Sequence, residues 1–386
     1  MTNMNPLRRL HDFGQSPWYD NIHRKMLTSG ELERMIQEDG VRGITSNPTI
    51  FQNAINNSHN YDDQIKQLLE EYPEQNSRDL FFSLAITDIQ KAADLLHPIY
   101  NKSHGIDGMV SLEVSPDLAY NADQTVSEAL QLVKRVNRPN LMIKVPATWE
   151  GLSAIETLTS EGVSINATLL FSNKRYQEVL EAYLLGLEAR LRRGQPIDNI
   201  SSVASFFISR VDAMVDKQLD QKMETADSHT KNQLQSLKGK IAISNAKLSY
   251  QHFKKISSSR RCKDLLECGG QMQRLLWAST GTKNPTYSDV LYVDTLIGAD
   301  TVNTIPPATF EAYKDHGNPQ ATLETDLDLA KSNVDALKAL DIDLNIITDH
   351  LEDEGVKSFS DSFNALLSAI QKKADVIINE RHTVEA

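Results

Sequence analysis

Eight short β-type runs alternate with helical stretches in this sequence, and this alternation constrains the fold more than any other feature. Amphipathic segments such as "YQEVLEAYLLGLEARL" lie between the runs. Strands that alternate with helices eight times are typical of a closed parallel barrel. The Gly-rich phosphate turn that usually follows the first strand of an open doubly wound sheet is absent. The sequence therefore predicts an α/β fold, a (β/α)8 TIM barrel. The β-type runs are 16–22, 43–48, 108–116, 141–147, 163–172, 202–212, 274–280 and 300–306.

Two segments are longer than a simple barrel requires. Residues 213–272 exceed one crossover helix and predict two or three added helices before the seventh strand. After the last strand, apolar residues recur at helical spacing and predict C-terminal helices over about 320–386. We expect one domain over the 386 residues, with the barrel core at about 16–319. The apolar residues that recur after the last strand form a stripe of Leu323, Leu327, Ala330, Val334 and Leu337. A second helical face follows at Phe363, Leu366, Leu367 and Ile370.

Charge and composition exclude several classes of protein. The formal net charge of -12 argues against a nucleic-acid partner and against binding to an anionic membrane surface. No apolar run approaches the roughly 20 residues of a membrane span, and the N-terminus lacks a secretory signal. The 10 histidines are scattered without metal-ligand spacing, and 2 cysteines make no disulfide framework. We expect a cytoplasmic protein with no metal.

The fourth β-type run, "NLMIKVPAT", places a lysine at the centre of a buried strand. Because side chains alternate along a strand, Leu141, Ile143 and Val145 share one face, and Lys144 points to the other. In a barrel the second face is the interior. Lys144 also lies near the C-terminal end of its strand, where barrel enzymes carry their chemistry.

The same alternation turns polar side chains of other strands toward that end of the barrel. Leaving one of them buried and unsatisfied would cost roughly 1–3 kcal/mol, so a set of this size indicates a site. Singly, each has an ordinary explanation, since Asn47 before Pro48 is also a turn signal. The set comprises Asp20, Thr45, Asn47, Ser111, Glu113, Asn166, Thr168, Ser205 and Ser279, and Phe207 shares the face of Ser205.

An enclosed lysine suggests imine chemistry. Burial favours the neutral amine, which is a nucleophile toward a ketone, and the resulting iminium accepts electrons when a neighbouring C–C bond breaks. Glu113 with Thr168, and separately Asp20, are candidates for the proton transfers. A structural lysine or a phosphate anchor are the alternatives that the residues leave open. Arg210, Lys283 and Ser279 are candidates for holding a phosphate.

Several motifs together resemble the transaldolase family, in its longer, Mycobacterium-like bacterial branch. They are "GITSNPTIF", "SLEVSPDLAYN", "LMIKVPAT", "INATLLFS", "FFISRVD" and "RLLWASTGTKNPTYSDVLYVDTLIGADTVNTIPPAT". The resemblance covers nearly the whole chain. It implies a pathway step in which a dihydroxyacetone unit moves from sedoheptulose 7-phosphate to glyceraldehyde 3-phosphate. The products are erythrose 4-phosphate and fructose 6-phosphate, in the non-oxidative pentose phosphate pathway.

The resemblance also implies a role for each motif residue. Lys144 is the Schiff-base nucleophile, Glu113 and Thr168 hold a proton-relaying water, and Asp20 is the acid/base at the cleaved bond. No metal or organic cofactor is implied, and the substrates are small sugar phosphates. The binding residues implied are Asn47 and Asn166 for the dihydroxyacetone hydroxyls, Ser205 beside them, Phe207 as an aromatic wall, and Arg210, Ser279 and Lys283 for phosphate.

Four points stay open at this level. Shorter members carry an arginine where Lys283 stands, and lysine lacks the bidentate fork. An aldolase that releases free dihydroxyacetone and a non-catalytic sugar-phosphate-binding barrel are alternative functions, and a homodimer is one assembly to test. Cys262 and Cys268 are either unrelated thiols or a redox pair.

Overall fold

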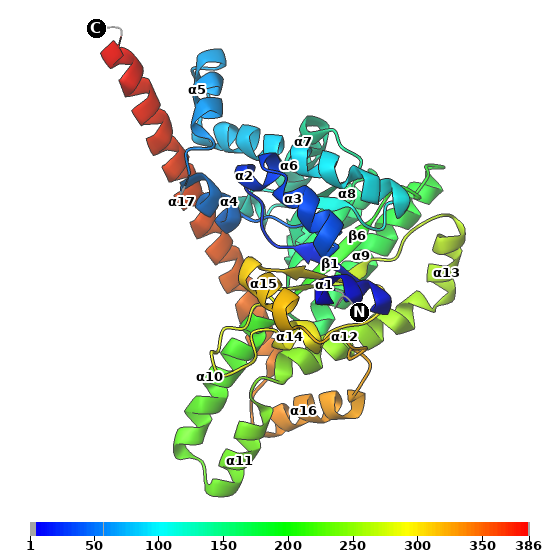
Figure 1. Ribbon diagram of the computed structural model, residues 1–386. Coiled ribbons are helices and arrows are strands. Elements are labelled where there is room, and N and C mark those ends of the chain that lie inside the picture. The colour runs from blue at the N-terminus through cyan, green and yellow to red at the C-terminus, as the bar shows by residue number, and fades with distance from the viewer. Residues whose placement is uncertain (1–4, 57, 385–386) are drawn as a thin grey trace.

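Eight parallel strands close into a barrel in chain order, as the alternation predicts. The computed structural model describes residues 5–56 and 58–384, and within them β1 pairs with both β2 and β8. Figure 1 shows the helices arranged around this barrel. The strands are β1 Gln15–Tyr19, β2 Gly43–Ile44, β3 Met109–Glu113, β4 Leu141–Pro146, β5 Ile165–Leu170, β6 Ser202–Phe207, β7 Arg274–Ala278 and β8 Thr301–Ile305.

The helices follow the strands on the outside of the barrel. Each β-type run predicted from the sequence overlaps one strand, although β1 begins one residue before its run. Strand β2 has only 2 residues because Pro48 begins a helix soon afterwards. The helices are α1 Pro6–Arg9, α2 Arg24–Thr28, α3 Glu31–Arg34, α4 Pro48–Asn56, α5 Asp62–Glu71, α6 Ser77–Lys102, α7 Ala122–Val136, α8 Trp149–Ser160, α9 Asn173–Arg192, α10 Ser209–Thr225, α11 Ser228–Leu237, α12 Ile241–Ser257, α13 Arg260–Glu267, α14 Leu291–Asp294, α15 Pro307–His316, α16 Leu327–Ala339 and α17 Leu344–Val384.

The long connection between β6 and β7 holds four helices, α10 to α13. Figure 1 shows α10 and α11 as a hairpin that projects from the barrel. Cys262 is buried in α13 and Cys268 is exposed at its end, and both are free thiols. The connection is thus built of helices, and α12 packs against both α16 and α9.

The C-terminal region forms α16 and one helix of 41 residues, α17. The apolar stripe runs through α16, but Leu323 lies before this helix and is buried in the preceding loop against Gly298. Helix α17 packs along α4, α5 and α6 (Figure 1). It is fixed by an ion pair of 3.1 Å between Arg175 and Glu352 and by one of 2.7 Å between Lys373 and Asp62.

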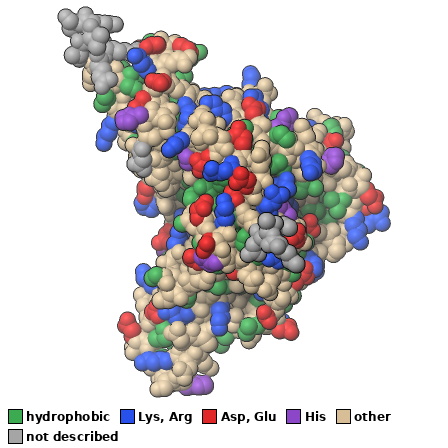
Figure 2. All heavy atoms as spheres, in the orientation of Figure 1, with side chains coloured by type: hydrophobic (Ala, Val, Ile, Leu, Met, Phe, Trp, Pro, Cys, Tyr) green, Lys and Arg blue, Asp and Glu red, His purple; other side chains and the backbone are tan. Residues whose placement is uncertain are grey.

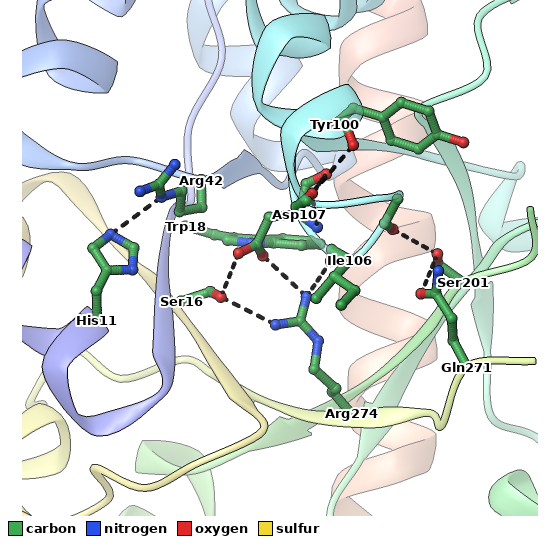
Figure 3. Close-up of polar contacts among 12 residues, drawn as sticks. His11, Ser16, Trp18, Arg42, Tyr100, Ile106, Asp107, Ser201, Gln271 and Arg274 are labelled. Atoms are coloured by element: carbon green, nitrogen blue, oxygen red, sulfur yellow. Dashed lines mark hydrogen bonds and ion pairs between the residues drawn. The ribbon is translucent and has the colours of Figure 1, made fainter. Parts of the chain in front are cut away.

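A polar network closes the N-terminal end of the barrel. The Asp107 carboxylate accepts a hydrogen bond of 2.8 Å from Ser16 and pairs with Arg274 at 3.0 Å (Figure 3). Trp18 packs beside them and is fully buried. These groups therefore satisfy one another at the beginnings of the strands. The opposite end carries the candidate site.

On the face shown in Figure 2, acidic and basic side chains are interspersed rather than gathered by sign. Within the part of the chain that the structure describes, no helix has both the length and the apolar character needed to cross a bilayer. Among the same residues, no group of three or more His, Cys, Asp or Glu side chains is placed to hold a metal ion.

Candidate active site

A cavity of about 460 Å³ opens at the C-terminal ends of the strands. Most of the residues that the sequence indicates line it, Thr45 among them, and the others, which include Ser111, lie behind its wall. The lining set is Asp20, Thr45, Asn47, Lys144, Ser205, Phe207, Arg210, Ser279 and Lys283. Ser111, Glu113, Asn166 and Thr168 are buried in the barrel interior instead.

Strand register sets three polar residues side by side. Glu113 of β3 pairs in register with Lys144 of β4, which in turn pairs with Asn166 of β5. Because neighbouring strands present registered residues to the same face, the three side chains form one layer of the barrel interior. The apolar residues on either side of Lys144 in sequence are also buried, on the helix-facing side.

The Lys144 amine is buried and makes polar contacts with the Ser46 carbonyl oxygen and with the Glu113 carboxylate. Its side chain is only 5% exposed, and its Nζ donates a hydrogen bond of 3.2 Å to the Ser46 carbonyl oxygen. Its Nζ lies 3.6 Å from a Glu113 carboxylate oxygen, which is an ion-pair contact longer than a good hydrogen bond. The amine is therefore enclosed, yet it faces the cavity.

Glu113 is a buried carboxyl group whose oxygens have no hydrogen-bond partner among the described residues. Burial raises its pKa to about 7, and the neighbouring Lys144 charge offsets part of this effect. Both of its carboxyl oxygens, and the hydroxyl of Thr168, make no hydrogen bond within the described part of the chain. Buried polar atoms without protein partners mark a place that suits a bridging water. A carboxyl that titrates near neutral pH can both donate and accept protons.

Asp20 lies just past β1 on the other side of the lysine. Its Oδ1 accepts a hydrogen bond of 2.6 Å from Thr45, whose hydroxyl also lies 2.6 Å from that of Thr304. Burial raises the Asp20 pKa, whereas the Lys144 charge and the Thr45 hydrogen bond lower it. The two carboxyl groups thus stand in different environments, as separate proton-transfer roles require.

The amide residues are held by their neighbours. Asn166 accepts a hydrogen bond of 2.7 Å from Ser205 and donates one of 3.0 Å to Ser111, so its orientation is fixed. The Asn47 Oδ1 accepts from the backbone N–H of Ile50 at 3.0 Å and caps α4, while the residue also lines the cavity. The turn-forming and site-forming interpretations of Asn47 are therefore compatible.

Two cations lie at the outer part of the cavity. Arg210, in the first turn of α10, is half-buried, and its guanidinium lies 5.6 Å from the centre of the Phe207 ring. Burial lowers its pKa, while Glu354 acts against this. Lys283 is exposed, and neither cation makes a hydrogen bond or ion pair with the residues that the structure describes. Ser279 lies beside them with φ at 55°.

Helix α17 supplies a wall that sequence reasoning missed. Phe359 is 4% exposed and lines the cavity, with the Lys144 Nζ 5.7 Å from its ring centre. Four residues earlier, Gly355 lets the helix approach β5, since a Cβ there would lie 3.0 Å from Leu169. No local signal in the sequence marks Phe359, because its place depends on how α17 crosses the barrel. Thr304, which lines the cavity, and Ser46, whose carbonyl accepts from Lys144, were likewise not assigned to the site.

The chain is similar to known proteins over almost its entire length. The family model described as transaldolase/fructose-6-phosphate aldolase matches residues 17–370. A transaldolase of Trichodesmium erythraeum is 44% identical over 372 residues, which are 96% of this chain and 97% of that protein. One of Thiobacillus denitrificans is 45% identical over 95% of this chain and 100% of its own.

A transaldolase of Mycobacterium bovis is 42% identical over 378 residues, covering 97% of this chain and 99% of that protein. The resemblance inferred from the motifs is therefore confirmed. Since both the family model and these relatives extend across the barrel strands and into α17, the chain belongs to the transaldolase/fructose-6-phosphate aldolase family.

Proposed function

We propose that the protein is a transaldolase that moves a dihydroxyacetone unit from sedoheptulose 7-phosphate to glyceraldehyde 3-phosphate through an imine on Lys144. The observation that carries this proposal is an enclosed lysine that faces a cavity, with the Glu113 carboxyl 3.6 Å from its amine and the Asp20 carboxyl held nearby by Thr45. The 42–45% identical relatives named transaldolase support the same activity.

Imine formation begins when the neutral Lys144 amine attacks the C2 ketone carbon of the donor. The carbinolamine then loses its hydroxyl as water. Glu113, acting through a water that it holds with Thr168, supplies the proton for this step. The unpartnered oxygens of Glu113 and Thr168 support this assignment.

Cleavage follows from the electron demand of the iminium. Asp20 takes the proton of the C4 hydroxyl, the C3–C4 bond breaks, and its electron pair moves into the iminium to give an enamine. The C4 fragment leaves as an aldehyde, and the acceptor aldehyde reacts with the enamine by the reverse sequence. Ser205 and Asn47 bind the dihydroxyacetone hydroxyls, and Asn166 orients the Ser205 hydroxyl. Arg210, Lys283 and Ser279 bind the phosphate.

Reduction with borohydride in the presence of fructose 6-phosphate tests the mechanism. Hydride reduces the iminium to a secondary amine, so we expect a stable dihydroxyacetone adduct on the peptide that contains Lys144. Without an acceptor aldehyde, we expect no sustained release of free dihydroxyacetone. An adduct on another lysine would contradict the mechanism, and steady release would favour a hydrolytic aldolase.

We further propose that Phe359 favours transfer over hydrolysis. Its ring covers the Lys144 side of the cavity, so it keeps water from the enamine and iminium until the acceptor arrives. Phe359→Leu should raise the ratio of dihydroxyacetone release to transfer severalfold. The measurement compares both products from fructose 6-phosphate, with and without acceptor.

A matched control lies one turn further along the same helix. Phe363 is 2% exposed and packs on Phe81, with ring centres 5.5 Å apart, outside this cavity. Phe363→Leu should therefore reduce stability without changing the product ratio. If both variants change the ratio equally, the position of α17 rather than the Phe359 ring controls water access.

A further inference from the structure

Hydrogen bonds connect the chain around Lys283 to α10, the helix that carries Arg210. Tyr287 donates a hydrogen bond of 2.6 Å to the Asp216 Oδ2, and Tyr292 donates one of 2.9 Å to the Asp212 Oδ2. Asp212 and Asp216 are one helical turn apart on α10, two and six residues after Arg210. The chain that follows Lys283 is therefore attached at two points to one face of the helix that carries Arg210.

The added helices hold the other oxygen of each carboxylate. The backbone N–H of Ala242 donates to the Asp212 Oδ1 at 2.7 Å, and that of Gly239 donates to the Asp216 Oδ1 at 3.1 Å. These donors lie between α11 and α12 and at the start of α12. Asp216 thus joins the turn after α11 to the Lys283 loop, and Asp212 joins the start of α12 to α14, which follows that loop.

Gly239 shows how closely the segment and the loop fit. Its φ is 69°, and a Cβ built on it would lie 2.9 Å from the Tyr287 ring. A side chain at this position would therefore displace the ring from Asp216. The Tyr287 ring therefore packs directly on the turn after α11, and this close contact requires a glycine at position 239.

The anchoring matters because Lys283 lies between two cavities. It lines the candidate active site and also a second cavity of about 400 Å³, which contains Asp216, Asp220 and Glu224. Those carboxylates would attract its ammonium group away from a substrate phosphate. The Tyr287 and Tyr292 hydroxyls occupy one oxygen each of Asp216 and Asp212, and Lys283 makes no ion pair within the described part of the chain.

We propose that Tyr287 and Tyr292 are positioning residues that hold Lys283 at a fixed separation from Arg210, so that the 213–272 segment sets the affinity for the substrate phosphate. This inference rests on the proposed function, because it assigns the two cations to a phosphate. It also gives the added helices a role in substrate binding, although none of α11 to α13 lines the active-site cavity.

Tyr287→Phe and Tyr292→Phe test the proposal. Each removes one hydroxyl and leaves the ring, so we expect the KM for glyceraldehyde 3-phosphate and the Kd for inorganic phosphate to rise about threefold to tenfold. We expect kcat, and the KM for unphosphorylated glyceraldehyde, to stay unchanged. Isothermal titration calorimetry with inorganic phosphate gives the Kd independently of turnover.

Tyr183→Phe is the matched control. The Tyr183 hydroxyl is buried and donates to the Gln271 carbonyl oxygen at 2.9 Å, away from both cavities. This variant should lose stability but keep wild-type phosphate affinity. Unchanged phosphate affinity in both loop variants would overturn the proposal, as would an equal rise in KM for both forms of the acceptor.

The failure of the proposed function would look different. If the protein did not form the Lys144 imine, borohydride would leave no adduct on the wild-type enzyme. The phosphate Kd of the variants would still report whether the tyrosines position the cations.

Discussion

Replacing Lys144 with alanine should lower kcat by at least about 10⁴-fold and abolish borohydride trapping, because no other group can form the covalent intermediate. The fold should persist. Lys144 faces a cavity rather than the packed core, so its truncation removes little packing. Glu113, whose pKa is already about 7, can take up a proton when its cationic neighbour is lost. Turnover, adduct mass and thermal unfolding are the measurements.

Lys247 provides the control for the loss of a buried lysine. It is 6% exposed on α12, and its Nζ donates to the Thr325 carbonyl oxygen at 2.8 Å. Lys247→Met should lower the unfolding temperature while the Lys144 adduct still forms. Unfolding of Lys144→Ala under conditions where Lys247→Met remains folded would identify Lys144 as a structural lysine.

Glu113→Gln should lower kcat by about 10²–10⁴-fold, the range that general acid–base catalysis typically contributes. The glutamine keeps the shape of the side chain but cannot exchange a proton with the bridging water. In single-turnover experiments, the rate of imine formation should fall accordingly. The substitution tests the relay separately from the nucleophile, since Lys144 remains in place.

The raised pKa of Glu113 also predicts how the dehydration rate changes with pH. Dehydration of the carbinolamine needs the protonated carboxyl, and the Glu113 pKa is raised to about 7 by burial, with Lys144 lowering it and Asp20 raising it. The wild-type dehydration rate should therefore decline as pH rises through about 7. The variant should lack this inflection. A variant that retains it would assign the titration to another group.

Glu128→Gln controls for the loss of a partly buried carboxylate. Glu128 accepts a hydrogen bond of 2.9 Å from the Ser115 hydroxyl and lies outside the cavity, and burial raises its pKa as well. Its replacement should leave both the inflection near pH 7 and kcat intact. Equal losses in the two variants would point to general destabilisation.

The raised Glu113 pKa also implies a cost in stability. A carboxyl whose pKa is higher in the folded state than in the unfolded state destabilises the fold increasingly as pH rises from about 4.5 to about 7. Burial of the ionised Glu113 carboxylate therefore lowers the free energy of unfolding, and the Lys144 cation reduces that loss.

Strand periodicity explains why much of the barrel was predictable. Alternation is a local property of extended backbone, so the inward direction of Lys144 and Glu113 follows from their neighbours in sequence. The barrel register then brings them together, since each strand pairs with the next in chain order. The exact ends of the elements differ from the sequence prediction, as the 2-residue strand β2 and the start of helix α16 at Leu327 show.

The sequence by itself therefore determined the barrel, the inward direction of Lys144 and the polar side chains of the neighbouring strands. Strand periodicity and the order of the motifs are properties of residues close together in the chain. Only the tertiary structure decided that Phe359 covers Lys144, that the Ser46 carbonyl accepts from its amine, and that Tyr287 joins the Lys283 loop to Asp216. Each of these contacts joins elements that are distant in the chain. Their separation is fixed by barrel closure and helix packing, which no local pattern encodes.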